Sequence, residues 1–190
     1  MNILIGRNVA PVSNAIRVAH RPIVEYTIPL RDILEDASPH LHLSKSDVTL
    51  RFYDTLGLEQ RPSPWSAIKA LLKRRGDVDL VLYCMRRGRL TNEQAIHLRD
   101  IWKTFCHGDV PFVLVVCGAD YRRGSTEKWW EENGEELTEA VQVRFADHIC
   151  LNTWDPAHPS WQHQGTRYEE TQRLVRDMVI RNCRGLHSVS

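Results

Sequence analysis

Three short polar segments, each following an apolar run, carry the residue types that could do chemistry in this chain. They are Asp54-Thr55-Leu56-Gly57, Arg86-Arg87-Gly88-Arg89 and Cys117-Gly118-Ala119-Asp120. In sheets of parallel strands, ligands bind at the loops that leave the carboxyl ends of the strands. The arginines could face a phosphate, or they could form a solvated basic loop in which Gly88 supplies the turn. The two aspartates could bind a ligand, or they could simply cap turns.

The runs beside these segments have the patterns of strands. Residues 23–30 (IVEYTIPL) and 47–53 (DVTLRFY) are typical of strands, the second with alternating apolar and polar residues. Residues 80–85 (LVLYCM) and 110–116 (VPFVLVV) are apolar throughout, which predicts strands covered on both faces, as in a parallel sheet. Residues 148–152 (HICLN) could form a short last strand.

Capping signals and apolar stripes predict the helices between these strands. Ser63-Pro64 opens one helix, with serine as its cap and proline at its first position, and Gly76 ends it. Residues 91–94 (TNEQ) form a capping box for the next helix. The apolar stripe of that second helix is Ala95, Leu98, Ile101, Trp102 and Phe105.

Three more helices are expected, at 125–133, at 135–145 and at 168–183. The inner face of the last one would hold Tyr168, Thr171, Leu174, Val175, Met178 and Val179. The charged segment 31–46 is expected at the surface, with a short helical turn at 32–35.

Alternation of these strands and helices predicts one domain over residues 1–190 with a three-layer α/β fold. Its sheet would be mostly parallel, with helices on both faces. Strands 80–85 and 110–116 should be adjacent and parallel at the centre of the sheet, and strand 47–53 should run antiparallel to 23–30.

In order along the chain, the motifs resemble those of a group of fungal G-domain proteins in the septin and immunity-associated branch of the P-loop GTPases. The matching stretches are 53–58 (YDTLGL), 82–89 (LYCMRRGR), 105–106 (FC), 110–118 (VPFVLVVCG) and 129–133 (WWEEN). The resemblance covers about residues 1–155. This ordered set is far more specific than a lone D-x-x-G, which occurs widely by chance.

The resemblance implies a GTP hydrolase that binds GTP or GDP with Mg²⁺. Asp54 would contact the Mg²⁺ ion indirectly, and the amide of Gly57 would sense the γ-phosphate. Asp120 would accept hydrogen bonds from the guanine base, while Gly118 stands where most GTPases have a lysine that packs on the base. All four residues should lie on one rim of the sheet. Relatives of this kind can dimerise across the nucleotide face, so a homodimer is possible.

The chain departs from the family where the phosphates should bind. It contains no G-x-x-x-x-G-K-[ST], and so has no lysine for the β- and γ-phosphates and no hydroxyl for Mg²⁺. Residues 13–19 (SNAIRVA) stand where the family has S-N-D-A-x-G-C-T, and the switch threonine is missing. Residues 1–7 resemble the end of the helix that follows the P-loop, as in an N-terminally truncated G domain.

The strand that precedes the P-loop, central in this fold, would be missing as well. The strand ending at Asp54 and strand 80–85 should both flank it, and without it they would present apolar edges. Three outcomes are open. The two strands pair directly, residues 2–5 (NILI) substitute for the missing strand, or the sequence is truncated.

Composition and charge indicate which kinds of partner and which cellular compartment to expect. The chain has 25 lysines and arginines against 24 acids, for a net charge of +1, which gives no electrostatic case for nucleic acid as the main partner. No apolar stretch approaches the ~20 residues that span a bilayer. The five cysteines are odd in number, and the N-terminus is a poor signal peptide. We therefore expect a cytoplasmic protein with no membrane span.

Other candidate sites have simpler explanations. His40-Leu41-His42 and Cys106-His107 lack a second ligand pair at zinc-site spacing. Cys117 has no histidine or aspartate at the spacing of a catalytic triad, so it is expected to be structural. Trp129-Trp130 could form an exposed stacking surface, although one ring of such a pair is usually buried.

Two functional classes remain. The first is a GTP-binding G domain whose present chain is impaired in nucleotide binding and inactive in hydrolysis, with no catalytic residue to assign. The second is a pseudo-GTPase that keeps the fold as an interaction or scaffold module and binds no nucleotide.

Overall fold

A computed structural model describes most of the chain. The described residues are 23–34, 48–55, 57, 64–75, 78–106, 109–118, 126–151 and 165–187. The chain divides into two compact units, Met1–Asp77 and Val78–Ser190, which are treated separately below. A single domain over residues 1–190 stays a prediction.

The first unit contains an antiparallel pair of strands, as predicted. Strand β1 (Ile23–Pro29) pairs with β2 (Thr49–Thr55), and the pairs include Tyr26 with Phe52. The short helix α2 (Arg31–Leu34) follows β1, which confirms the expected helical turn. The backbone N–H of Leu30 donates to the carbonyl of Val48 (2.8 Å), so the pairing extends to the residue after β1.

The prediction that residues 31–46 lie at the surface holds for Arg31, which is exposed, but is wrong for Ile33. Leu30 and Ile33 have no exposed surface at all. The N–H of Ile33 donates to the carbonyl of Leu30 (3.0 Å), and this single turn directs two apolar side chains inward from a charged stretch. Residues 35–47, and with them the rest of the expected surface segment, lie outside the described part of the chain.

Helix α3 (Trp65–Arg75) begins close to the predicted position. The N–H of Ile68 donates to the carbonyl of Pro64 (3.0 Å), which closes the first turn around the buried proline. Leu71 is buried, and the ammonium of Lys69 lies 4.9 Å from the centre of the Trp65 ring. The expected cap, Ser63, and the expected stop, Gly76, lie outside the described residues.

The second unit contains a three-stranded parallel sheet in the order β3-β4-β5. Its strands are β3 (Val81–Arg86), β4 (Phe112–Cys117) and β5 (Asp147–Leu151). Adjacent, parallel β3 and β4 confirm the prediction, and the expected last strand is present.

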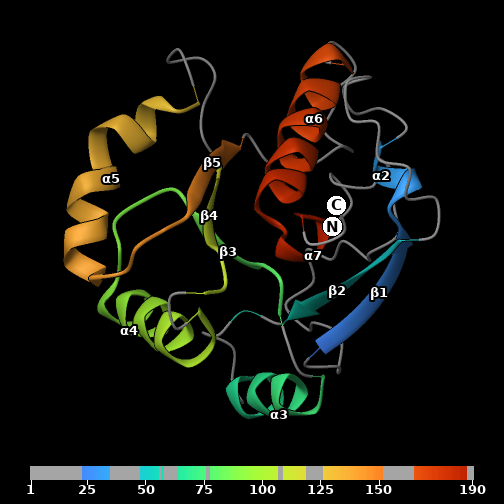
Figure 1. The fold of residues 1–190 in the computed structure, drawn as a ribbon. Helices are drawn as coiled ribbons and strands as arrows, with labels where there is room; N and C mark the ends of the chain where they lie inside the picture. Colours follow the sequence, from blue (N-terminus) through green and yellow to red (C-terminus); the bar gives the residue numbers. More distant parts are fainter. Residues whose placement is uncertain are drawn as a thin grey trace, which may run out of the picture. The chain divides into compact units, whose positions relative to one another are not determined.

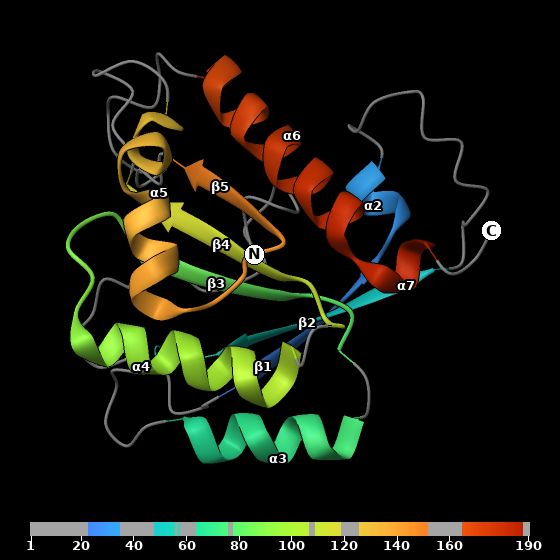
Figure 2. The same ribbon diagram turned by 60° about the vertical axis from the view of Figure 1, so that its left-hand side comes forward.

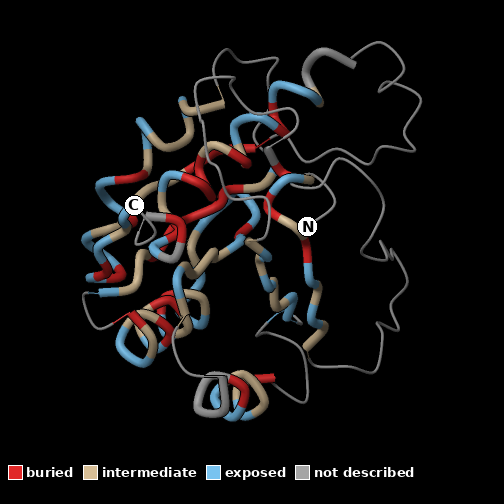
Figure 3. The backbone as a smooth tube through the Cα atoms, turned by 45° about the vertical axis from the view of Figure 1, so that its right-hand side comes forward, coloured by how far each residue is buried: buried red, intermediate tan, exposed pale blue. Residues whose placement is uncertain are grey.

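The prediction that β3 also lies at the centre is wrong for the described sheet, because β4 occupies the middle. All residues of 112–116 are buried, as expected for a strand covered on both faces, whereas Cys84 in β3 is exposed. Figure 3 shows the buried parts of the chain in red.

Helices cover both faces of this sheet. The helices after β3 are α4 (Asn92–Ile101) with the π-helical turn η1 (Trp102–Cys106), and the helix after β4 is α5 (Lys128–Val141). Both lie on one face, and α6 (Gly165–Asn182) lies on the other (Figures 1 and 2). The short helix α7 (Arg184–His187) ends the described chain. The second unit is thus a three-layer α/β structure. Among the described helices, none combines the length and apolarity needed to cross a bilayer.

The capping box of α4 forms as predicted, but the end of its apolar stripe is wrong. The N–H of Gln94 donates to Thr91 Oγ1 (3.2 Å), and the N–H of Thr91 donates to Gln94 Oε1 (3.0 Å). Ala95, Leu98 and Ile101 are buried, whereas Trp102 and Phe105 are half-buried and Cys106 is 1% exposed. The wider π-helical turn shifts the register by one residue, which brings Cys106 to the core.

The sequence predicted two helices over 125–145, and the structure has one. Gly134 stands inside α5 rather than between two helices. Its missing side chain leaves room for the indole of Trp130, because a Cβ at this position would lie 2.6 Å from Trp130 Cε2. The helix ends at Gln142, which has a left-handed backbone conformation (φ 51°).

Helix α6 was predicted correctly in place but only partly in its inner face. Thr171, Met178 and Val179 are buried as expected, but Leu174 is 41% exposed. Two polar residues, Gln172 and Arg176, are buried instead. A 3.6-residue period read from apolar residues alone misses polar side chains that point inward.

Asp147, the first residue of β5, links the sheet to the end of α6. Its Oδ2 accepts hydrogen bonds from Arg181 Nη2 (2.6 Å) and Asn182 Nδ2 (2.8 Å), and its Oδ1 accepts from the N–H of His148 (2.8 Å). Burial alone would raise the pKa of Asp147. The hydrogen bonds from Arg181 and Asn182 outweigh this effect, so the pKa lies below its usual value.

We expect Asp147→Asn to destabilise the protein by about 1 kcal/mol at pH 7, a modest value because Arg181 is 61% exposed. Since the folded-state pKa is lowered, the contribution of Asp147 is present above the unfolded-state pKa of about 4 and is lost as the pH falls through the folded-state value. Urea unfolding of both proteins at pH 7 and at about pH 3 measures this difference. An equal difference at both pH values would contradict the assignment.

Candidate functional site

The first predicted site segment, Asp54 to Gly57, begins inside a strand rather than after it. Strand β2 continues to Thr55, and Asp54 pairs with Val24 of β1. Asp54 and Gly57 are both exposed, so a ligand could reach them. The two residues belong to the first unit.

The third predicted segment begins at the end of β4 in the second unit. Gly118 directly follows this strand with φ +84°, a conformation that side chains rarely adopt, and its N–H donates to the carbonyl of Leu151 (2.9 Å). Gly118 therefore has a structural reason to be glycine. Asp120 lies outside the described residues. The placement of Asp54, Gly57, Gly118 and Asp120 on one rim stays a prediction.

The basic segment lies at the carboxyl end of β3. Arg86 is the last residue of the strand, and the N–H of Arg87 donates to the carbonyl of Cys117 (2.8 Å). Gly88 has φ +150°, which fits the turn that the sequence assigned to it. Arg86, Arg87 and Arg89 are all exposed, as expected of a solvated basic loop and equally of a loop that binds an anion.

A cluster that the sequence did not indicate joins the start of α5 to β5. Glu127 Oε2 lies 3.1 Å from His148 Nε2, and Glu127 Oε1 accepts a hydrogen bond from the N–H of Cys150 (3.1 Å). The imidazole of His148 stacks on the indole of Trp130, with ring centroids 4.0 Å apart and an angle of 15°. His148 and Cys150 are two residues apart in a strand and thus share a face, which was the one available sequence signal. Glu127 is 23 residues away from Cys150, so only the fold brings it there.

A carboxylate, a histidine and a cysteine in one cluster raise the question of nucleophilic catalysis. Burial and the negative charge of Glu127 raise the pKa of Cys150 to about 12. The thiolate, not the thiol, is the nucleophile, so Cys150 is unreactive at neutral pH. The cluster therefore holds α5 against β5 and is not assigned a catalytic role.

Aromatic rings extend this cluster across the sheet. Phe145 contacts Trp130 edge to face (6.2 Å between centroids) and stacks on Phe112 of β4 (5.5 Å). Phe112 in turn meets Tyr83 of β3 edge to face (6.3 Å). Both rings of the predicted Trp129-Trp130 pair are half-buried, and of the two it is Trp130 that stacks within the cluster.

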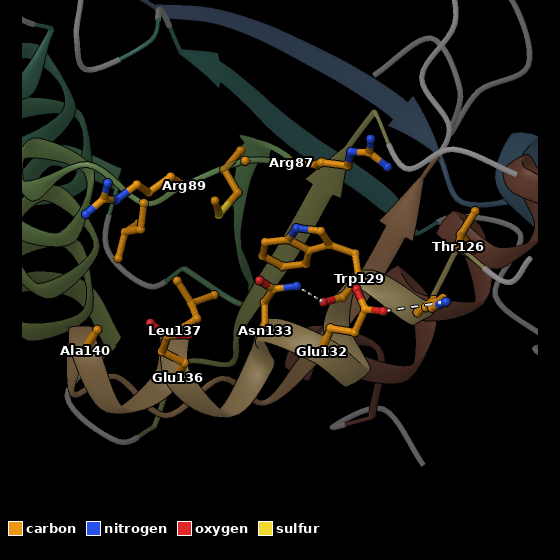
Figure 4. A pocket seen from close by; sticks show the side chains of 13 residues that line it. Arg87, Arg89, Thr126, Trp129, Glu132, Asn133, Glu136, Leu137 and Ala140 are labelled. Atoms are coloured by element: carbon orange, nitrogen blue, oxygen red, sulfur yellow. Dashed lines mark hydrogen bonds and ion pairs between the residues drawn. The ribbon is translucent and has the colours of Figure 1, made fainter. Parts of the chain in front are cut away.

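Trp129 lines a cavity of about 560 Å³ between the loop after β3 and one face of α5 (Figure 4). Its floor includes the buried side chains of Met85 and Leu137. This volume lies within the range of about 300–1,000 Å³ typical of small-molecule sites. Its charged and polar lining comprises Arg87, Arg89, Thr126, Lys128, Glu132, Asn133 and Glu136.

Within the described part of the chain, no group of three or more histidine, cysteine, aspartate or glutamate side chains could hold a metal ion. Comparison of the chain with protein-family models, curated proteins and solved structures found no match. The resemblance to G domains therefore rests on the motif residues themselves.

Gly134→Ala tests the packing that orients α5. The added Cβ would overlap Trp130, whose ring is held between His148 and Phe145, and overpacking of this kind costs about 1–3 kcal/mol. This exceeds or cancels the ~1 kcal/mol that alanine gains over glycine in a helix. We expect net destabilisation in urea unfolding, while Glu135→Ala, at an exposed position of the same helix, should change stability by less than about 0.5 kcal/mol. A Gly134→Ala protein that is clearly more stable than the original would show that Trp130 can move aside.

Alkylation rates test which cysteine thiols are buried and protonated in the folded protein. Burial raises the pKa of Cys106 to about 11, and Cys150 is higher still, whereas Cys84 is exposed. Alkylation of the native protein by iodoacetamide at about pH 7.5, mapped by mass spectrometry, should modify Cys84 first. Cys106 and Cys150 should react only after unfolding. Early modification of Cys150 would show that its thiol is reactive in the folded protein, and the Glu127 cluster would then be a candidate catalytic site.

Proposed function

We infer that this chain is a GTPase-like G-domain protein whose 190 residues, on their own, are impaired in guanine-nucleotide binding. The observation that carries the inference is the arrangement of its strands. An antiparallel pair ends in the D-x-x-G segment, and three parallel strands follow in the order β3-β4-β5, with helical crossovers. The resemblance implies this order, with one further strand between β2 and β3.

The division of the described strands into two sheets supports the inference. One sheet holds β1 and β2 and the other holds β3, β4 and β5. The resemblance implies that a G domain would have one further strand, the one that leads into the P-loop, flanked by the strand ending at Asp54 and by strand 80–85. Residues 2–5, the possible substitute strand, lie outside the described residues. Fold class alone does not establish an activity, so the proposal depends on the residues that would touch the nucleotide.

The residues that the chain lacks are the reason to expect weak nucleotide binding. In a P-loop, backbone amides and one lysine surround the phosphates, and a hydroxyl holds Mg²⁺. Without them several charge-assisted hydrogen bonds, at about 1.5–3 kcal/mol each, are lost. The exposed carboxylate of Asp54 would then repel the triphosphate instead of helping to hold a metal ion. Affinity should fall by several orders of magnitude.

The alternative is a pseudo-GTPase that acts as an interaction or scaffold module without nucleotide. It is favoured by Gly118, which stands where the base-packing lysine would be and has a left-handed conformation (φ +84°) that serves the backbone. The two candidates differ in whether the rest of the nucleotide site is intact.

Calorimetry with Mg²⁺ and GTP or GDP tests the proposal on the chain as it stands. We expect no hydrolysis above background and no dissociation constant in the micromolar range, because the phosphate contacts are missing. For the same reason Asp54→Asn should not weaken the residual affinity. Micromolar binding that weakens on Asp120→Ala would refute the impairment.

A second protein separates the two candidates. A strand and a G-x-x-x-x-G-K-S loop fused ahead of Met1 should restore binding if the remaining site is that of a GTPase. Asp120→Ala in this fusion is the matched control and should reduce the recovered affinity. Correct folding without any recovered binding would favour the scaffold module.

A further inference from the structure

The cavity beside α5 has walls of opposite charge. Arg87 and Arg89 come from the loop after β3, while Glu132 and Glu136 come from the facing side of α5 (Figure 4). Neither arginine, nor Glu136, has an ion-pair partner among the residues that the structure describes. Glu132 pairs with Lys128 of its own helix (3.6 Å) rather than with the loop. Opposite charges thus face the same space without neutralising each other across it.

The space between these walls is suited to an apolar group. Met85 and Leu137, each 5% exposed, form part of its floor. The indole of Trp129 lies between the two walls in Figure 4. Asn133 donates its amide N–H to the carbonyl of Trp129 (2.8 Å), which leaves its Oδ1 to accept a hydrogen bond.

We propose that this cavity binds a short zwitterionic peptide, with its carboxylate toward Arg89 and its ammonium toward Glu136. Guanidinium groups recognise carboxylates well because their donors form a planar fork. An apolar or aromatic side chain of the peptide would lie against Trp129 and Met85. A backbone N–H of the peptide would donate to Asn133 Oδ1.

The placement of the charges favours a peptide over a single amino acid. In an amino acid the ammonium and the carboxylate are bonded to the same carbon atom and are therefore close together. The charges of this cavity lie on opposed walls and call for a ligand whose charges are farther apart. Each further residue separates the two ends by up to about 3.5 Å. The cavity lies beside the loop after β3 and α5, and it includes none of the residues assigned to the nucleotide.

Three matched ligands test the proposal on the full 190-residue chain. They are glycyl-phenylalanine, its C-terminal amide and its N-acetyl derivative, which remove one charge at a time. We expect glycyl-phenylalanine to bind with a dissociation constant on the order of a millimolar, as befits a small ligand in an open site. Each derivative should bind about fivefold more weakly, the effect of one exposed ion pair. Calorimetry gives the constants, and NMR amide shifts should map to the loop after β3 and to α5.

Two variants test which residue of the cavity meets each charge of the ligand. Arg89→Gln should abolish the difference between the dipeptide and its amide while keeping the effect of acetylation, and Glu136→Gln should do the reverse. Glu139→Gln on α5 and Arg173→Gln on α6, which are exposed and do not line the cavity, should leave all three affinities unchanged. Equal affinities for the three ligands, shifts elsewhere in the protein, or no saturation at concentrations on the order of 10 mM would overturn the proposal.

Discussion

The arrangement of the second unit depends on the burial of β4. Its residues from Phe112 to Val116 are at most 6% exposed, so both faces of the strand must be covered. Its backbone groups also need partners on both edges, because an unpaired buried N–H or carbonyl is costly. Strands β3 and β5 supply those partners, and helices on opposite faces supply the cover. Parallel neighbours in turn require long crossovers, which α4 and α5 provide.

Helix α5 packs on the sheet with one side and lines the cavity with another. One side is fixed to the sheet through Trp130, whose indole is packed over Gly134 and stacked on His148. Trp129 and Asn133, one turn apart and linked by a hydrogen bond, lie on the side that lines the cavity. The packing that holds α5 on the sheet therefore also determines which side chains face the loop after β3.

The proposed function and the cavity concern different residues. The proposed nucleotide site concerns Asp54, Gly57, Gly118 and Asp120. The cavity concerns α5 and the basic loop, and its argument needs only the charges and apolar surfaces that line it. A chain without a P-loop can keep the sheet and its helices, because β4 and its neighbours are stabilised by burial and backbone pairing, not by phosphate contacts.

The sequence by itself determined the elements whose signals are local. Short apolar runs, with alternation of apolar and polar residues in 47–53, located all five described strands, and the pattern at Thr91 located a capping box, because these features depend on residues a few positions apart. Tertiary structure decided what local patterns do not contain. It placed Gly134 inside one helix, it buried Arg176 and exposed Leu174 of the predicted inner face, and it left β4 alone in the middle of its sheet. It also brought Glu127 to His148 and Glu136 opposite Arg89, since contacts between distant segments arise only when helices pack on a sheet.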